Sequence, residues 1–173
     1  SVDDALLRVL AVPPAHGRLF AAGETDVSGP PPTPGTPAPQ PASVVILSHE
    51  LWQTAFGGRA LVGETVEVNG IAREVIGIMP PGVDVMDNRT EIWMPLGLNP
   101  GNRQNRGSHF LYLIGRLKDG VTPQMADAEL TALIQNWGER VNVKNHVFAP
   151  LPDSAEGRKQ NPGAGHILQM DPV

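Results

Sequence analysis

The sequence contains no cysteine, which excludes disulfides, thiolate metal sites and a cysteine nucleophile. Long apolar runs are also absent. The longest, at residues 44–47, 75–79 and 110–114, are far below the roughly 18 to 20 residues that a membrane-spanning helix needs. Basic residues are few, because 13 lysines and arginines face 18 acidic residues and leave a net charge of -5. This balance argues against nucleic acid or an anionic membrane surface as a partner.

The chain begins without a basic, apolar signal segment, which fits either a cytosolic protein or a piece of a longer one. We favour the second interpretation because of the motifs described below. A length of 173 residues, 40% of them hydrophobic, suffices for one core or for two small cores that share a seam. We therefore expect a single domain over residues 1–173, divided into two lobes.

The sequence contains histidine and serine residues of the kinds used in metal binding and catalysis, but they do not have the spacing that such sites require. No two histidines have the spacing of a metal-binding pair; they are His16, His49, His109, His146 and His166. Ser48 precedes a histidine, which could suggest a hydrolase, but no G-x-S-x-G elbow surrounds it. Helix capping accounts for Ser48. We therefore expect no catalytic residue, no metal site and no cofactor.

The remaining polar and aromatic candidates receive structural interpretations. Asp84, Asp87 and Glu91 have no spacing that would make them face one another, so we predict solvated loop carboxylates. The tryptophans lie on apolar faces and are predicted to belong to the core; they are Trp52, Trp93 and Trp137. Arg18 and Arg116 have apolar neighbours, so each needs a carboxylate partner or a route to the surface.

Proline and glycine are abundant, with 18 and 19 residues, and much of the proline lies in residues 28–43. Each proline removes a backbone donor and fixes φ, so this segment is predicted to be a solvated, polyproline-like loop. We interpret it as a tolerated insertion rather than as a PxxP-type ligand. Residues 150–165 combine proline, glycine and charge and are predicted to be a loose segment.

The first half of the chain predicts a helix, a strand and a second helix. Residues 3–10 have the pattern of a short amphipathic helix, and residues 43–47 that of a buried strand. Ser48 is the expected N-cap of a two-turn helix that Gly57 ends. The apolar face of this helix is predicted to consist of Leu51, Trp52, Ala55 and Phe56.

A β-hairpin is the clearest local signal. Asn69-Gly70 supplies the two positive-φ residues of a type I′ turn, so the flanking strands should pair with Val68 opposite Ile71. One face of this hairpin is predicted to carry Val66, Val68, Ile71 and Val75.

The second strand of the hairpin is predicted to continue through residues 75–79 into the core. Further strands are predicted at residues 92–96, 110–117 and 166–170, and proline confines the first of these to a sheet edge or a strand end. A long helix should begin with Thr122 as N-cap and Pro123 at its first position, and run to about residue 141. Its apolar positions are Ala126, Leu130, Leu133, Ile134, Trp137 and Val141. The fold class expected is α+β: a small mixed or antiparallel sheet with a β-hairpin and two main helices.

Seven stretches in this order resemble the periplasmic core domain of MacB-like and FtsX-like ABC transporter permeases, including orphan permeases without a fused ATPase. They are LAVPPAHGRLF at 10–20, VVILSHELW at 44–52, FGG at 56–58, VGETVEVNG at 62–70, VIGIMP at 75–80, IWMPL at 92–96 and GRLKDGVT at 115–122. The resemblance covers roughly residues 5 to 135. No single stretch is specific, but the series is.

The resemblance implies a non-catalytic domain on the outer face of the bacterial inner membrane, held between two transmembrane helices of a permease. It implies two subdomains, one of them related to the porter modules of drug efflux pumps. Such a domain contacts a substrate or a periplasmic partner and transmits conformational change. The partners implied are a second permease protomer, a cytoplasmic ATPase acting indirectly and a periplasmic adaptor, with no nucleic acid.

Three departures from the family pattern stand out. Ala11 occupies a position where glycine is usual, the loop within residues 28–43 is longer than expected, and few residues precede the first helix. The last departure implies unpaired sheet edges, which would favour a homodimer of this segment by itself.

The candidate contact sites are the loops at residues 28–43 and 84–90. The alternative function is a stand-alone secreted or periplasmic ligand-binding module with its pocket between the hairpin and the helix that begins after Thr122. An enzyme of hydrolase type that uses Ser48 is a third, formal alternative.

Overall fold

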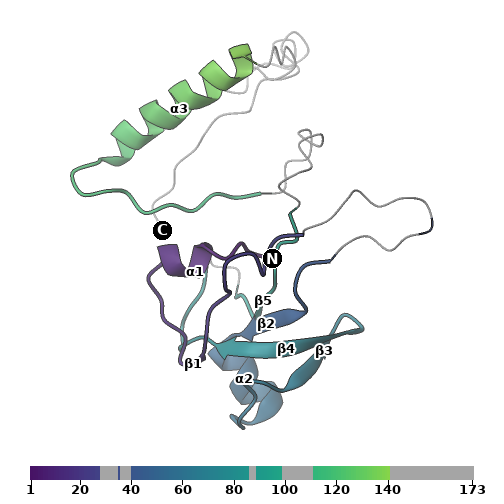
Figure 1. The fold of residues 1–173 in the computed structure, drawn as a ribbon. Helices are drawn as coiled ribbons and strands as arrows, with labels where there is room; N and C mark the ends of the chain where they lie inside the picture. The colour runs from purple at the N-terminus through teal and green to yellow at the C-terminus, as the bar shows by residue number, and fades with distance from the viewer. Residues whose placement is uncertain (28–34, 36–39, 86–88, 99–110, 141–173) are drawn as a thin grey trace, which may run out of the picture. The chain divides into compact units, whose positions relative to one another are not determined.

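The computed structural model describes residues 1–27, 35, 40–85, 89–98 and 111–140. The chain divides into two compact units, Ser1–Arg116 and Leu117–Val173. The helices are α1 (Leu6–Val9), α2 (His49–Phe56) and α3 (Pro123–Arg140). The strands are β1 (His16–Gly17), β2 (Val44–Leu47), β3 (Thr65–Val68), β4 (Ile71–Ile78) and β5 (Ile92–Trp93) (Figure 1).

The first unit is built on a five-stranded mixed sheet. Its strand order is β1-β4-β2-β5, and β3 pairs with the free part of β4. The central strands β2 and β4 are parallel, whereas β1, β3 and β5 each pair antiparallel. Because α2 and β3 lie between the parallel strands in sequence, they form the crossover connection that a parallel pair requires. The protein therefore has the predicted α+β fold with a mixed sheet.

The hairpin of β3 and β4 confirms the turn predicted from Asn69-Gly70. Both residues have positive φ angles, of 54° and 75°, and Val68 lies opposite Ile71. The predicted inner face holds for Val66, Val68 and Val75, which contact the core, but Ile71 is 47% exposed. The reason is its place beside the turn, where the hairpin extends past the end of its parallel neighbour at Val44.

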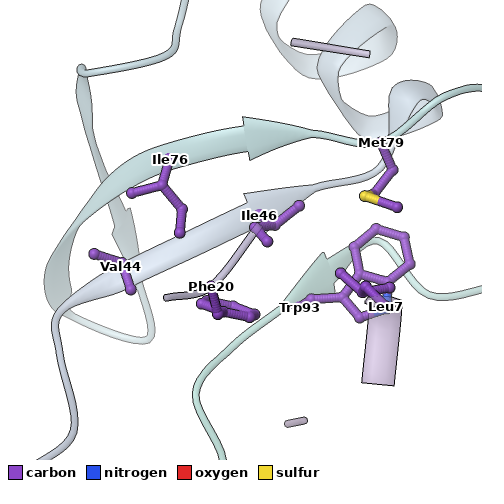
Figure 2. Close-up of a cluster of buried hydrophobic side chains, with 7 residues drawn as sticks. All are labelled: Leu7, Phe20, Val44, Ile46, Ile76, Met79 and Trp93. Atoms are coloured by element: carbon purple, nitrogen blue, oxygen red, sulfur yellow. The ribbon is translucent and has the colours of Figure 1, made fainter. Parts of the chain in front are cut away.

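Both faces of the sheet are covered, which explains why β2 and the second half of β4 are apolar. All four residues of β2 are buried, and so are the last four residues of β4. Figure 2 shows one face, where side chains of β2 and β4 meet residues from α1 and β5. That cluster consists of Leu7, Phe20, Val44, Ile46, Ile76, Met79 and Trp93. The prediction that Trp93 belongs to the core is confirmed.

The opposite face of the sheet is covered by α2. The core cluster on this face consists of the buried residues Val45, Leu47, Leu61, Val75 and Ile78. Leu51, Trp52 and Phe56 of the helix are half-buried and pack against this cluster, as predicted. Ala55 was expected on the same face but is exposed, because the short helix presents only a narrow stripe to the sheet.

A pair of glycines lets β1 lie close to β4. Gly17 is opposite Gly77 in the antiparallel ladder. A Cβ atom on Gly77 would clash with the carbonyl oxygen of Arg18, and one on Gly17 would clash with the carbonyl oxygen of Ile76. Sequence reasoning missed β1, because a two-residue strand leaves no periodic pattern.

Ala11 is one of the described non-glycine residues with a positive φ, at 56°. It follows α1, where the amide of Ala11 donates to the carbonyl of Arg8 at 3.0 Å. A left-handed residue at a helix end is the usual place for glycine, which has no Cβ to strain. The structure thus gives a physical reason for the glycine that the family pattern prefers here.

We predict that Ala11→Gly stabilises the protein. Relief of the left-handed strain should outweigh the added freedom of the unfolded chain, giving a gain of about 1 kcal/mol in the free energy of unfolding. Urea unfolding followed by circular dichroism measures it. The matched control is Ala55→Gly, at an exposed position inside α2, which should instead cost about 1 kcal/mol. A loss of stability in Ala11→Gly would contradict the argument.

The predicted strand at residues 110–117 is wrong for its described part, residues 111–117, which form neither strand nor helix. Tyr112 is 79% exposed and Leu113 is 90% exposed. Strand propensity reflects how well side chains fit a paired, half-buried surface rather than an isolated preference of the backbone. Within the described residues no strand pairs with this segment, so its apolar pattern has no surface to fit.

The second unit is described by residues 117–140, most of which form α3. The amide of Met125 donates to Thr122 Oγ1 at 3.2 Å, so Thr122 caps the helix and Pro123 occupies its first position, as predicted. Ala126 is buried and Trp137 is half-buried, but Leu130 and Leu133 are 37% and 58% exposed. The apolar face predicted for this helix is therefore only partly covered.

Several predictions lie outside the described residues. These are the loose segment at 150–165, the strand at 166–170, Asp87, Val141 and three of the histidines, together with most of residues 28–43. Among the described residues, no helix combines the length and the apolar character needed to cross a membrane.

Candidate interaction surface

The two loops predicted to make contacts lie at opposite ends of the central parallel pair. Residues 28–43 lead into β2, which begins at Val44, whereas β4 ends at Ile78 and leads toward residues 84–90. Because β2 and β4 are parallel, the first loop joins the amino end of the pair and the second follows its carboxyl end. Residues 40–43, the described part of the first loop next to β2, therefore lie at the other end of the strand pair from the point where β4 ends.

The carboxyl end carries the better described surface. We use the term carboxyl-end surface for one group of residues. It consists of His16, His49, Glu50 and Trp52 together with residues 82–85 and 89–90. His16 belongs to it because it pairs with Ile78, the last residue of β4.

Asp84 organises the loop that follows β4. Its Oδ1 accepts the amide of Val85 at 2.7 Å, and its Oδ2 accepts the amide of Arg89 at 2.8 Å. The amide of Thr90 approaches Oδ1 at 3.4 Å. Asp84 is exposed in a loop, as predicted, and its side chain also closes this loop by satisfying backbone donors. Arg89, with a φ of 44°, is held in a left-handed conformation by this closure.

The loop is fastened to the start of α2 by two hydrogen bonds. Glu50 Oε1 accepts the amide of Gly82 at 3.0 Å, and this bond is the main cause that lowers the pKa of Glu50 below its ordinary value. The amide of Ser48 donates to the carbonyl of Glu91 at 2.8 Å. Glu50 also lies in the first turn of the helix, where a negative charge is favourable. These two hydrogen bonds therefore fix the described loop residues of the carboxyl-end surface to α2.

Three aromatic side chains form part of the carboxyl-end surface. The Trp52 ring is flanked by two imidazoles, with ring centroids 5.1 Å away for His16 and 5.6 Å away for His49. Its indole Nε1 donates to the carbonyl of Arg59 at 2.7 Å. One side of Trp52 therefore packs against the core, as predicted. Its ring also contacts His16, which is exposed, and His49, which is half-buried.

The geometry at Ser48 is that of a helix cap. Its Oγ accepts the amide of Leu51 at 3.0 Å, and the residue is 2% exposed. The neighbouring His49 ring contacts Trp52 edge-on, and no hydrogen bond joins a histidine to Ser48 Oγ in the described part of the chain. A nucleophile needs a base within hydrogen-bond reach and access to substrate. Within the described residues, no cluster of three potential metal ligands occurs.

We predict that Ser48→Ala lowers the free energy of unfolding by about 1 kcal/mol, because the amide of Leu51 loses its acceptor. Urea unfolding measures the loss, and Ser48→Thr should recover most of it. The matched control is Thr54→Ala in the same helix. The Thr54 hydroxyl donates to the carbonyls of Glu50 and Leu51 and accepts no backbone amide, so this variant should stay within about 0.5 kcal/mol of the parent. An unchanged stability in Ser48→Ala would refute the capping role.

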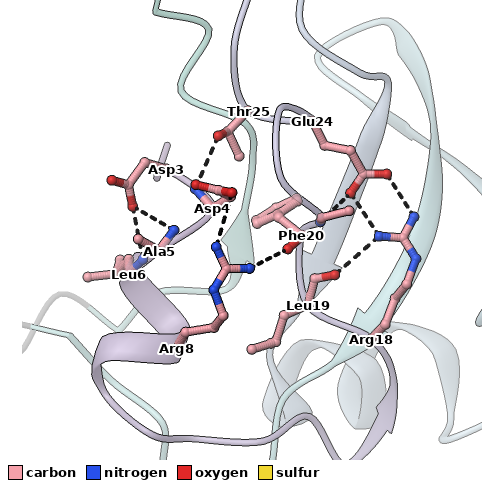
Figure 3. Close-up of polar contacts among 11 residues, drawn as sticks. Asp3, Asp4, Ala5, Leu6, Arg8, Arg18, Leu19, Phe20, Glu24 and Thr25 are labelled. Carbon is pink, nitrogen blue, oxygen red and sulfur yellow. Dashed lines mark hydrogen bonds and ion pairs between the residues drawn. The ribbon is translucent and has the colours of Figure 1, made fainter.

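Two arginines hold the segment between α1 and β2 (Figure 3). Arg18 forms a bidentate ion pair with Glu24, with both N–O distances at 2.8 Å. Arg8 contacts Asp4 at 3.0 Å and donates to the carbonyl of Phe20 at 3.0 Å. The carboxylate partner expected for Arg18 is thus Glu24. Arg116 instead uses Nε to donate to the carbonyl of Val9 at 3.0 Å on the surface.

The Arg18–Glu24 ion pair should make the stability of the fold depend on pH. Arg18 lowers the pKa of Glu24 from its ordinary value of 4.5, mainly through the hydrogen bond, while burial opposes the shift. A carboxyl whose pKa is lower in the folded state stabilises the fold above its unfolded pKa, and this stabilisation disappears as pH falls through the folded-state value. Acid destabilisation below about pH 4.5 should therefore be shallower in Glu24→Gln than in the parent.

Urea midpoints measured from neutral pH down to the acid limb test this expectation. Arg18→Met should flatten the acid limb in the same direction, since it removes the main cause of the shift. Because Arg18 is half exposed, the pair should be sensitive to salt. Identical acid limbs in the parent and Glu24→Gln would show that Glu24 does not contribute.

Sequence reasoning missed some of the residues that order these loops. Thr25 is 2% exposed, and its Oγ1 accepts the amide of Asp4 at 3.1 Å. Glu24 likewise was not identified, although it pairs with Arg18 and accepts the backbone amide of Ala21 at 2.8 Å. A carboxylate or hydroxyl next to glycine and proline is a weak signal of loop closure, and it does not specify the partner.

Comparisons with known proteins point to one family. The family model described as the MacB-like periplasmic core domain matches residues 1–133. No curated protein matches the chain. Among solved structures, the periplasmic region of MacB from Actinobacillus actinomycetemcomitans is similar, with a TM-score of 0.49 at 20% identity. The similarity covers 78% of this chain and 54% of that chain, so the present chain spans about half of the solved region.

Proposed function

Because this chain belongs to the MacB-like periplasmic core domain family, the extracytoplasmic domains of ABC-type permeases, we propose that it contacts a substrate or a periplasmic partner and transmits conformational change. We propose further that the domain performs no chemistry of its own. The buried, capping role of Ser48 supports this second part, since the residue most suggestive of a nucleophile is used to hold a helix.

The observation that carries the proposal is the central strand pair of the sheet. Each described residue of β2 and of the second half of β4 is buried, and hydrogen-bonded loops follow directly at the carboxyl end. A close-packed element of this kind moves as a body rather than deforming. A displacement of the carboxyl-end surface by a partner would therefore move the amino end of the sheet, where residues 28–43 enter.

The carboxyl-end surface is the contact site for which the structure offers most support. Its loop is closed by Asp84 and tied to α2 by Glu50, so its shape exists before a partner binds. Preformed surfaces lose less conformational entropy on binding. Residues 28–43 remain the second contact site that we propose. The division into two units is compatible with two lobes, and the porter-like nature of one lobe stays a prediction.

The contact role can be tested in the full-length permease reconstituted with its ATPase. Arg89 is exposed on the proposed contact loop, and only its backbone amide serves the loop through Asp84. We expect Arg89→Glu to lower partner- or substrate-stimulated ATPase activity several-fold while leaving basal activity unchanged. The control is the same charge reversal at Arg59, beyond the other end of α2. Equal stimulation in both variants and the parent would rule out this loop as a contact.

Transmission needs a separate measurement. Since this domain has no cysteine, a single Arg89→Cys substitution gives one spin-label position in it. The distance between labels on two protomers of the permease should change when the ATPase binds nucleotide. An unchanged distance distribution, at a level of ATPase activity equal to that of the unlabelled permease, would mean that the domain does not take part in transmission.

A further inference from the structure

The turn between β3 and β4 combines the features that make an asparagine chemically unstable. Asn69 is the one asparagine in the sequence that a glycine follows. Both residues are exposed at the tip of the hairpin. In the described part of the chain, neither the Asn69 amide group nor the Gly70 N–H takes part in a hydrogen bond, because the turn is closed by the pairing of Val68 with Ile71.

We propose that Asn69 is a site of spontaneous deamidation in the folded protein. After losing its proton to hydroxide, the backbone nitrogen of Gly70 attacks the side-chain carbonyl carbon of Asn69. The bond from that carbon to the amide nitrogen breaks, the departing nitrogen takes a proton from water and leaves as ammonia, and a five-membered succinimide forms. Water then opens the ring at one of its two carbonyl carbons. Opening at the side-chain carbon gives aspartate, and opening at the main-chain carbon gives isoaspartate.

Each feature of the turn favours one part of this reaction. Gly70 has no Cβ to block the approach, and its φ of 75° marks a position that residues with side chains avoid. The exposed tip admits hydroxide and water. The amide of Asn69 has no acceptor to hold it away from its own backbone. The glycine that folds the hairpin is therefore the same residue that exposes the asparagine to attack.

Isoaspartate would not fit the turn. It carries the main chain through the former side-chain carbon, which adds one methylene group to a loop of two residues. The type I′ geometry depends on two adjacent positive-φ residues of normal length. The pairing of Val68 with Ile71 would shift, and Val66 and Val68 would lose their contacts with the core cluster on the α2 face. Isoaspartate formation would thus loosen β3 from β4, whereas β4 stays paired with β1 and β2.

The test follows the folded 173-residue chain during incubation at neutral and mildly alkaline pH. Peptide mapping by mass spectrometry should show loss of the Asn69 peptide and two products of equal mass, at a rate that rises with hydroxide concentration. An isoaspartyl methyltransferase should label the chain in parallel. Asn136, which precedes Trp137 in α3, is the internal control and should stay intact.

Asn69→Gly is the matched variant, because a Gly-Gly pair keeps the turn but removes the amide. It should abolish the methyl label and keep the thermal midpoint of the chain constant during incubation, while that of the parent falls. Two results would overturn the proposal. One is conversion of Asn69 in the urea-unfolded chain only, with the folded chain intact over the same period. The other is a methyl label that persists in Asn69→Gly.

Discussion

Gly77→Ala should lower the free energy of unfolding by about 3 kcal/mol, at the upper end of the cost of inserting a methyl group into a close-packed site. The added Cβ would clash with the carbonyl oxygen of Arg18, which is a backbone atom and cannot rotate away. Relief requires that β1 move off β4, and this would disturb the chain that leads to the buried Phe20. Urea unfolding followed by far-ultraviolet circular dichroism measures the loss.

Gly115→Ala is the matched control. Gly115 has no positive φ, and no heavy atom of the described residues, apart from Gly115 and its two chain neighbours, lies within 4 Å of the position that its Cβ would take. The same substitution there should change the stability by less than about 0.5 kcal/mol. If the two variants differed by less than 1 kcal/mol, roughly the low end of the cost of overpacking, the close approach of β1 to β4 would not be a constraint on the fold.

Trp93→Ala is expected to cost about 4 kcal/mol, because removal of a buried aromatic side chain leaves a cavity that the surrounding residues fill only in part. Trp93 is 1% exposed and lies between β2 and the residues of α1 (Figure 2). The same cluster includes Leu7 of α1 and Met79, which directly follows β4. The cavity would therefore open on residues of α1, of β2 and of the segment after β4. Trp93→Phe should recover part of the loss.

Tyr112→Ala removes an aromatic ring of comparable size that is 79% exposed, and it should stay within about 0.5 kcal/mol of the parent. Equilibrium unfolding in urea gives both values under the same conditions. A Trp93→Ala loss below 2 kcal/mol, well under the usual cost of a buried aromatic truncation, would mean that the cluster collapses around the gap.

The parts of the fold that sequence reasoning predicted correctly are set by neighbours in the chain. Asn69-Gly70 dictates a turn type, Ser48 supplies a cap oxygen three residues before the amide that needs it, and Thr122 does the same for α3. These devices act within four residues, so they can be seen without knowledge of the tertiary structure.

The failures depend on distant partners. The apolar residues of 111–117 have the composition of a strand, but a strand needs a neighbour, and composition does not say whether one is present. The same limit applies to Leu130 and Leu133, whose helical spacing predicts burial although both are exposed. A periodic pattern identifies a face, whereas the surface that covers the face lies elsewhere in the chain.

The proposed contact surface could be predicted only in outline. The loop at residues 84–90 was identified as a candidate, but its closure by Asp84 and its attachment to Glu50 are hydrogen bonds to backbone amides, which carry no sequence signature. Ala11 is the instructive exception. The family pattern has glycine at this position, and the φ of 56° found there explains that preference.

The start of the chain is hydrogen-bonded to the strand region at which the sheet ends. The amide of Val2 donates to the carbonyl of Met94 at 2.8 Å, and the amide of Leu96 donates to the carbonyl of Val2 at 2.9 Å. Val2 and Pro95 form a parallel bridge, so the entrance to the sheet core and the exit from it lie side by side. Further along the chain, the amide of Gly97 donates to the carbonyl of Thr25 at 2.8 Å, and the amide of Val27 donates to the carbonyl of Leu98 at 2.9 Å. A pull on the chain beyond Leu98 would therefore be borne first by these two hydrogen bonds, and only after them by the bonds that join Val2 to Met94 and Leu96.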